Sequence, residues 1–225
     1  MQTSVSYRFV TIAALFVTCL ITANILIAKQ VAICGLILPA AIIIFPLSYI
    51  IGDVLTEVYG YGQARRVIWL GFLCNLIAII AIWIGNILPP APVFEAQAAY
   101  ERILGSTPRF LLASFIAYLG GEFTNSFILA KMKVQTRGRW LWARTIGSTI
   151  VGQGVDTVLV LFIGFWGVLP FSILGTMILS HWLVKTAYET AATPLTYGIV
   201  GYLKRKEGID VYDYKTKFNP FRFTE

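Results

Sequence analysis

The chain of 225 residues is 57% hydrophobic and only 13% charged, and its mean hydropathy is +0.74. Soluble domains carry about twice this charged fraction, so the composition excludes an ordinary soluble protein and predicts one that lies in a lipid bilayer. The net charge is +7, but the Lys and Arg residues lie mostly in short segments between apolar runs, which argues against a nucleic-acid-binding surface.

Six apolar segments are long enough to be transmembrane helices, since a helix needs about 20 residues to cross the hydrocarbon core. The first follows Arg8 as the core of a signal peptide would, but it is longer than such a core and no small-x-small cleavage site clearly ends it. Pro46 interrupts the second segment and Pro194 lies in the sixth, where neighbouring helices can satisfy the freed carbonyl groups. We predict the six spans at about 8–28, 36–57, 67–88, 109–130, 145–168 and 174–203.

The basic residues between these segments predict their orientation, because cytoplasmic loops are enriched in Lys and Arg. One set of alternating sides holds Arg8, Arg65, Arg66, Lys131, Lys133, Arg137, Arg139, Arg144, Lys204, Arg205, Lys206, Lys215, Lys217 and Arg222. The opposite sides hold only Lys29, Arg102 and Arg109. Six spans with both termini in the cytoplasm therefore place nearly all the positive charge inside.

These patterns predict an all-α membrane protein. We expect a single compact bundle of six transmembrane helices at residues 1–203, followed by a polar, partly disordered cytoplasmic tail at 204–225. The largest external loop, 89–108, is expected to form a short amphipathic helix on the membrane surface.

The chain lacks the motifs of several enzyme classes. It contains no GxxxxGK[ST] phosphate-binding loop, no HExxH, no GxSxG and no paired His–carboxylate metal pattern. The three cysteines have no metal-ligand spacing. We therefore expect no enzymatic activity, no cofactor and no bound metal.

Ionisable residues inside the predicted spans are the strongest signal of function. A charge near the bilayer centre costs about 2.5–3.5 kcal/mol on insertion scales, so such residues should face a shared polar interior. They recur at helical spacing with other polar residues, which predicts one polar cavity between the helices. The polar residues that form these patterns include Asp53, Glu57, Ser114, Tyr118, Glu122, Asn125, Gln153, Asp156, His181, Lys185 and Glu189.

Several of these residues also have structural interpretations. Lys185 is predicted to pair with Asp156 or with Glu189, and Asp53 and Glu57 could instead neutralise basic residues at the membrane interface. Small residues such as Ser148, Gly121 and Gly152 are typical of close helix packing.

Pairing alone leaves more carboxylates than cations. Because a carboxylate accepts two parallel hydrogen bonds, the cavity suits a substrate that is cationic or rich in N–H donors. Aromatic side chains that could stack on a flat ring are Phe115, Tyr118, Phe162, Phe165 and Trp182.

The stretch from Gly52 to Tyr61, GDVLTEVYGY, followed by Ala64-Arg65-Arg66, resembles the signature of the queuosine-precursor transporter family, also called vitamin uptake transporters. Shorter matches lie in the other spans, so that the resemblance covers about residues 10–203. They comprise Asn24, Ala113-Ser114-Phe115 with Tyr118, Ser148-Thr149 with Gly152, Asp156-Thr157, and Lys185 with Pro194 and Tyr197.

The resemblance implies import of 7-deazaguanines, such as the 7-cyano and 7-aminomethyl compounds, across the inner (plasma) membrane for tRNA modification. It also implies a fold similar to the substrate-binding subunits of energy-coupling-factor transporters, and such a subunit with a separate ATPase module is the alternative function. The expected partners are a purine-like small molecule and the lipid bilayer but no nucleic acid, and a homo-oligomer is compatible with the sequence. The candidate substrate-binding residues are Asn24, Asp53, Glu57, Tyr118, Glu122, Asn125, Gln153, Asp156, Lys185 and Glu189.

Overall fold

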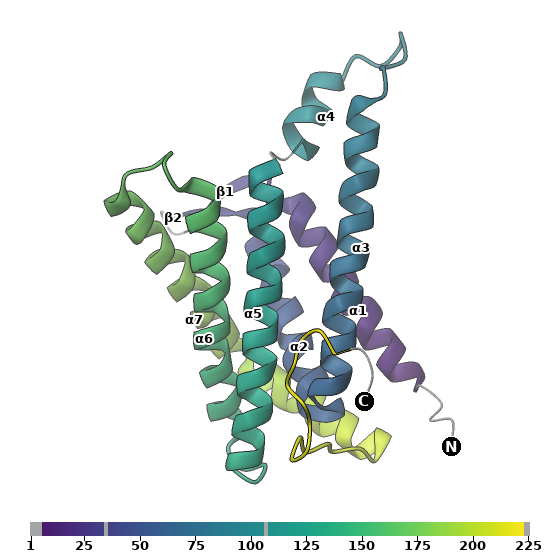
Figure 1. Cartoon of the computed structure of the whole chain (residues 1–225), viewed down its shortest axis with the longest axis vertical. Helices are drawn as coiled ribbons and strands as arrows, with labels where there is room; N and C mark the ends of the chain where they lie inside the picture. Colours follow the sequence, from purple (N-terminus) through teal and green to yellow (C-terminus); the bar gives the residue numbers. More distant parts are fainter. Residues whose placement is uncertain (1–5, 34–35, 106–107, 223–225) are drawn as a thin grey trace.

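The computed structural model describes residues 6–33, 36–105 and 108–222. Figure 1 shows that it is a bundle of long helices, with a short hairpin and a short helix at one end. Six long α-helices lie in the described part of the chain: α1 (Tyr7–Leu26), α2 (Phe45–Tyr59), α3 (Tyr61–Ile87), α5 (Pro108–Gln135), α6 (Leu141–Phe165) and α7 (Phe171–Glu207). The shorter elements are β1 (Gln30–Ile33), β2 (Leu36–Pro39), the 3-10 helix η1 (Ala40–Ile43) and α4 (Gln97–Leu104).

Five helical segments among the described residues are long and apolar enough to cross a membrane. They are α1, η1 together with α2, α3, α4 together with α5, and α6. The multi-pass architecture is thus confirmed. α7 is not among the five, because polar residues in its middle, including His181, Lys185 and Glu189, lower its mean hydropathy.

The chain between α1 and α2 differs from the predicted helix that begins near residue 36. Strands β1 and β2 pair antiparallel, with Gln30 opposite Pro39 and Ile33 opposite Leu36. β-Branched residues such as Val31 favour a strand. Pro46 lies in the first turn of α2, where its missing N–H costs no helical hydrogen bond. The prediction that Pro46 interrupts a helix was therefore wrong, because this proline begins one.

The first and last helices meet at one end of the bundle. Ser6 Oγ and Arg8 Nη1 both donate to Glu207 Oε1, at 2.7 and 3.1 Å. Figure 1 shows the start of α1, the end of α7 and the tail at this end, whereas α4 and the hairpin lie at the opposite end. α4 confirms the short helix expected in the loop 89–108.

Small residues let α5 and α6 approach closely. A Cβ atom added to Gly152 would lie 2.7 Å from Cβ of Asn125, and one added to Gly121 would lie 2.7 Å from Cβ of Asp156. The predicted packing role of these two glycines is therefore confirmed. It brings the polar faces of the two helices together.

The described part of the tail, 208–222, packs against the base of α2 and α3. The Val211 N–H donates to the Val58 carbonyl at 3.2 Å, and the indole N–H of Trp69 donates to the Pro220 carbonyl at 2.8 Å. Asp213 is buried and accepts the backbone N–H of Tyr61 at 3.1 Å. Over these residues the tail is ordered by specific contacts, in contrast to the expected partial disorder.

Candidate functional site

A cavity of about 290 Å³ lies between the helices, in the half of the bundle remote from the two termini. Its volume is close to the lower end of the range found for small-molecule sites. Most of its wall is apolar and aromatic, and a few polar groups converge on it. These polar lining residues are Asn24, Asn75, Ser114, Tyr118, Asp156, Thr157, His181 and Lys185.

Asp156 and Lys185 form an ion pair on the wall of this cavity. Lys185 Nζ donates to Asp156 Oδ2 at 2.7 Å, and it also lies 4.4 Å from the centroid of the Phe45 ring. Only 6% of the Asp156 side chain and 14% of the Lys185 side chain are exposed. Of the two predicted partners of Lys185, the structure therefore selects Asp156. The residual exposure leaves the pair accessible from the cavity.

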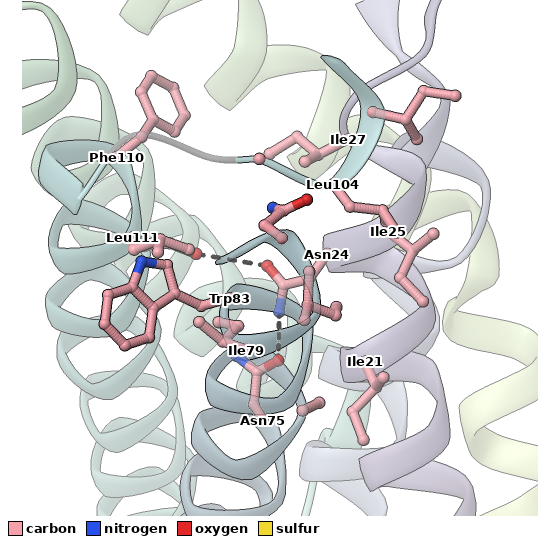
Figure 2. A pocket seen from close by; sticks show the side chains of 16 residues that line it. Ile21, Asn24, Ile25, Ile27, Asn75, Ile79, Trp83, Leu104, Phe110 and Leu111 are labelled. Atoms are coloured by element: carbon pink, nitrogen blue, oxygen red, sulfur yellow. Dashed lines mark hydrogen bonds between the residues drawn. The ribbon is translucent and has the colours of Figure 1, made fainter. Parts of the chain in front are cut away.

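Polar side chains from three helices form a second group at the cavity wall. Asn24 of α1 donates its amide N–H to Asn75 of α3 at 2.9 Å, and Ser114 of α5 approaches Asn24 Oδ1 at 3.5 Å. Figure 2 shows Asn24 and Asn75 facing each other beside a smaller pocket of about 80 Å³. Asn75 was not among the predicted site residues. Its signal is the one amide within the apolar run 67–85.

Aromatic residues divide between the cavity and its surroundings. Of those predicted to stack on a substrate, Tyr118 and Phe165 line the cavity. Phe115 instead packs edge-on against Phe72, Phe162 packs against Trp166, and Trp182 donates to the Ile150 carbonyl at 2.8 Å. Phe45 and Phe110 complete the aromatic wall.

A polar layer lies beyond the cavity, towards the end that holds the termini. Its carboxyl groups are Asp53, Glu122 and Glu189, each at most 6% exposed. Asn125 donates to Asp53 at 2.7 Å, Thr149 donates to Glu189 at 2.7 Å, and Gln153 also donates to Glu189. None of these three carboxyl groups lines the cavity or forms an ion pair among the described residues. We call these three carboxyl residues with Asn125, Thr149 and Gln153 the polar layer.

Glu57 lies deeper still and is surrounded by cations. Its Oε1 atom is 2.9 Å from Arg144, 2.7 Å from Lys204 and 3.6 Å from Lys133. Lys133 and Lys204 also contact Asp210 of the tail, at 2.5 and 2.9 Å. We call these five residues the Glu57 cluster. Arg65 takes no part, because it donates to backbone carbonyls of the tail.

The ten predicted site residues thus lie at three depths. Asn24, Tyr118, Asp156 and Lys185 line the cavity. Asp53, Glu122, Asn125, Gln153 and Glu189 belong to the polar layer beyond it. Glu57 belongs to the charged cluster. Their assignment as substrate ligands remains a prediction.

Comparison with known proteins connects this architecture to transport. The profile of the family described as putative vitamin uptake transporter matches residues 39–199. The chain belongs to this family. The predicted family membership is therefore confirmed. No solved structure gave a significant match, so the expected likeness to energy-coupling-factor subunits stays a prediction.

Two curated relatives of this transporter carry more specific names. A protein of Bacillus subtilis (strain 168), named probable queuosine precursor transporter, is 30% identical over 179 residues, which are 79% of this chain and 78% of the relative. The queuosine precursor transporter of Escherichia coli (strain K12) is 27% identical over 145 residues, which are 64% and 63% of the two chains. Neither name describes a subunit of a larger transporter.

The region matched by the family profile contains most of the candidate site. Asp156, Lys185 and the carboxyl groups of the polar layer lie within residues 39–199. Asn24 precedes the matched region, and Lys204 and Asp210 of the Glu57 cluster follow it.

Proposed function

We propose that this protein imports queuosine precursors, the 7-deazaguanines with a 7-cyano or 7-aminomethyl group, across the inner membrane. The names of its relatives support this substrate class. In the proposed arrangement α7 is a sixth span, and both termini lie in the cytoplasm. The alternation of basic residues and the meeting of α1 with α7 at one end support an even number of crossings.

The observation that carries the proposal is the ion pair of Asp156 and Lys185 on the cavity wall. A guanine-like edge presents a carbonyl oxygen, a ring N–H and an amino group side by side. The Lys185 ammonium can donate to the carbonyl, while the Asp156 carboxylate accepts from the two neighbouring N–H groups. A cation and an anion held together therefore complement this edge better than either charge alone.

The rest of the cavity suits a flat, partly polar ring. Phe45, Phe110, Tyr118 and Phe165 provide apolar and aromatic wall against which a heterocycle can stack. Asn24, Asn75 and Ser114 supply amide and hydroxyl groups from other helices. Thr157 Oγ1 is buried and has no hydrogen-bond partner in the described structure, so it is free to contact a substrate.

The position of the cavity fits import. With cytoplasmic termini, the half of the bundle that holds the cavity is the outer half, from which an imported substrate arrives. The polar layer, together with Glu57, Lys133 and Arg144 of the Glu57 cluster, closes the inner half with buried side chains. Release to the cytoplasm then requires these contacts to open, as alternating access demands.

Uptake of labelled 7-cyano-7-deazaguanine into cells that lack their own transporter tests the proposal. Cells expressing this chain should accumulate label, whereas cells expressing Asp156→Asn should not, although that variant reaches the membrane in equal amount. Glu95→Gln, an exposed carboxyl change outside the helices, is the matched control and should transport normally. Equal uptake by cells with and without the chain would refute the proposed substrate.

A further inference from the structure

Glu122 differs from the other buried carboxyl groups of the helix bundle among the described residues. It is fully buried on α5, and neither carboxyl oxygen has a hydrogen-bond partner among the described residues. Asp156 has Lys185, and Glu57 has three cations. Asp53 and Glu189 at least accept hydrogen bonds from neutral side chains.

Among the described residues, no cation forms an ion pair with Glu122. A Cβ atom added to Gly52 of α2 would lie 3.0 Å from Glu122 Oε2 and 3.7 Å from the Phe16 ring of α1, so α1 presents an apolar ring here. The titratable groups near it are Tyr49 and Asp53 of α2, Tyr118 one turn away on α5, Asp156 of α6 and Glu189 of α7. Lys185, the cation that lines the neighbouring cavity, is already held by Asp156.

An ionised carboxylate without a partner is very costly in such an interior, whereas a neutral carboxylic acid costs much less. Two features place this acid where a transport cycle can use it. It lies one turn from Tyr118, which lines the cavity, and the adjacent Gly121 contacts both Asp156 and Tyr49. The Tyr49 hydroxyl, beside Gly121, is also buried and has no hydrogen-bond partner among the described residues.

We propose that Glu122 is the proton-binding site that couples uptake to the proton gradient. This inference rests on the proposed transport function. In the outward-facing state, one proton from the cavity side forms an O–H bond with a Glu122 carboxylate oxygen. When the inner half opens, water reaches Glu122, the O–H bond breaks and the proton leaves to the cytoplasm. One proton then enters with each substrate molecule.

The geometry favours a proton over a metal cation. A hard metal cation needs about six or more oxygen ligands. Among the described residues, no group of three or more His, Cys, Asp or Glu side chains is placed to hold a metal ion. A proton needs only one carboxylate oxygen and a path to water.

Transport into proteoliposomes is the first test. The purified full-length protein is given labelled 7-cyano-7-deazaguanine, with the membrane potential clamped and the outside more acidic by one pH unit. Coupling to one proton should raise accumulation up to about tenfold over the value without the gradient. For Glu122→Gln, which keeps the size of the side chain but binds no proton, this ratio should fall to about one. Glu95→Gln should behave as the wild type.

Either of two results would overturn the proposal. The first is that the pH gradient raises accumulation by Glu122→Gln as much as it raises accumulation by the wild type. The second is that accumulation by the wild-type protein follows a sodium gradient but not a proton gradient. Glu122→Asp, which keeps the acid but shortens it, should retain part of the response to the pH gradient. It provides the test if Glu122→Gln fails to fold.

Infrared spectroscopy tests proton binding without any substrate. The wild-type protein should show a carbonyl band of a protonated carboxylic acid that decreases reversibly as the pH rises. Glu122→Gln should lose this band and Glu95→Gln should keep it. If the wild type transports no deazaguanine, the proposed function fails and this band alone decides the role of Glu122. A spectrum unchanged by Glu122→Gln, or a band insensitive to pH, would contradict it.

Discussion

At the scale of single residues, Lys185 lies between a carboxylate and an aromatic ring. Its contacts with Asp156 at 2.7 Å and with the Phe45 ring at 4.4 Å compensate for the loss of hydration around a charge inside the helix bundle. Such a pair can be purely structural, or it can also bind substrate. The two roles predict different transport activity for a variant in which both charges are removed.

We expect Lys185→Met to abolish uptake and to lower stability, because it leaves the Asp156 charge without a partner. Breaking one side of a buried pair costs about 3–5 kcal/mol in soluble proteins. Lys185→Met combined with Asp156→Asn should regain most of this stability but should not transport. Thermal unfolding in detergent and uptake in cells measure the two effects. Restored transport in the double variant would show that the pair is structural.

Glu57 presents the opposite arrangement, a single buried anion held by several cations. We expect Glu57→Gln to destabilise the protein by about 3 kcal/mol or more, since Lys133 and Arg144 are only 1% exposed and would lose their shared partner. Glu207→Gln is the matched control and should cost less, because its partner Arg8 is 44% exposed. Thermal unfolding in detergent gives both values, and equal losses would contradict this account of the cluster.

The residues also show which parts of the site the sequence predicted. Helical spacing placed Tyr118, Asp156 and Lys185 correctly on inward faces, and all three line the cavity. Glu122 shares the face of Tyr118 but lies four residues further along, about 6 Å deeper, beyond the end of the cavity. Periodicity predicts a face but not the depth at which a cavity ends.

At the scale of elements, several helices extend beyond their predicted ends. α5 continues to Gln135, α6 begins at Leu141 and α7 continues to Glu207. The sequence predicts Lys133 in a loop and Lys204 at the start of the tail, yet both lie on these extensions and contact Glu57. Hydropathy marks where a helix leaves the hydrocarbon, and the helix itself continues until its backbone is capped.

The segment before α2 illustrates a different difficulty. Its sequence is apolar enough to belong to a transmembrane helix, and a short apolar run does not distinguish a strand from a helix. The pairing of β1 with β2 makes this segment a strand, and such a contact is not visible in local sequence.

The tail contributes a cap to α3 that comes from outside the helix. The backbone N–H of Tyr61, at the start of α3, donates to Asp213 Oδ2 at 3.1 Å. We expect Asp213→Ala to lower stability by about 1.5–3 kcal/mol, because a hydrogen bond to a charged acceptor is lost at a buried helix end. Thr216→Val removes only the bond of Thr216 to Asp213 within the tail and should cost less. Equal melting temperatures for Asp213→Ala and the wild type would exclude the cap.

At the scale of the whole molecule, the proposed topology has six crossings and cytoplasmic ends. A reporter fused after Glu225 that is active only outside the cytoplasm should therefore stay silent. The same reporter inserted after Glu95, between α3 and α4, should be active and serves as the control. Activity of the C-terminal fusion would contradict the six-span arrangement.

The arrangement of the molecule gives each depth a separate task in the proposed cycle. The outer cavity binds substrate, the polar layer holds the proton on Glu122, and the Glu57 cluster with the tail closes the inner end. The sequence predicted the bundle and its polar interior. It could not predict this division, which depends on the relative positions of neighbouring helices along their axes.

Comparing the binding of two ligands that differ by one amino group to the purified protein tests the central claim most directly. The claim is that Asp156 and Lys185 together recognise a guanine-like edge in the cavity. Titration calorimetry should show that 7-cyano-7-deazaguanine binds about tenfold or more tightly than the analogue without the 2-amino group, because that analogue leaves Asp156 with an unused acceptor. In Asp156→Asn this preference should disappear. Equal affinity of the wild-type protein for the two compounds would contradict the account.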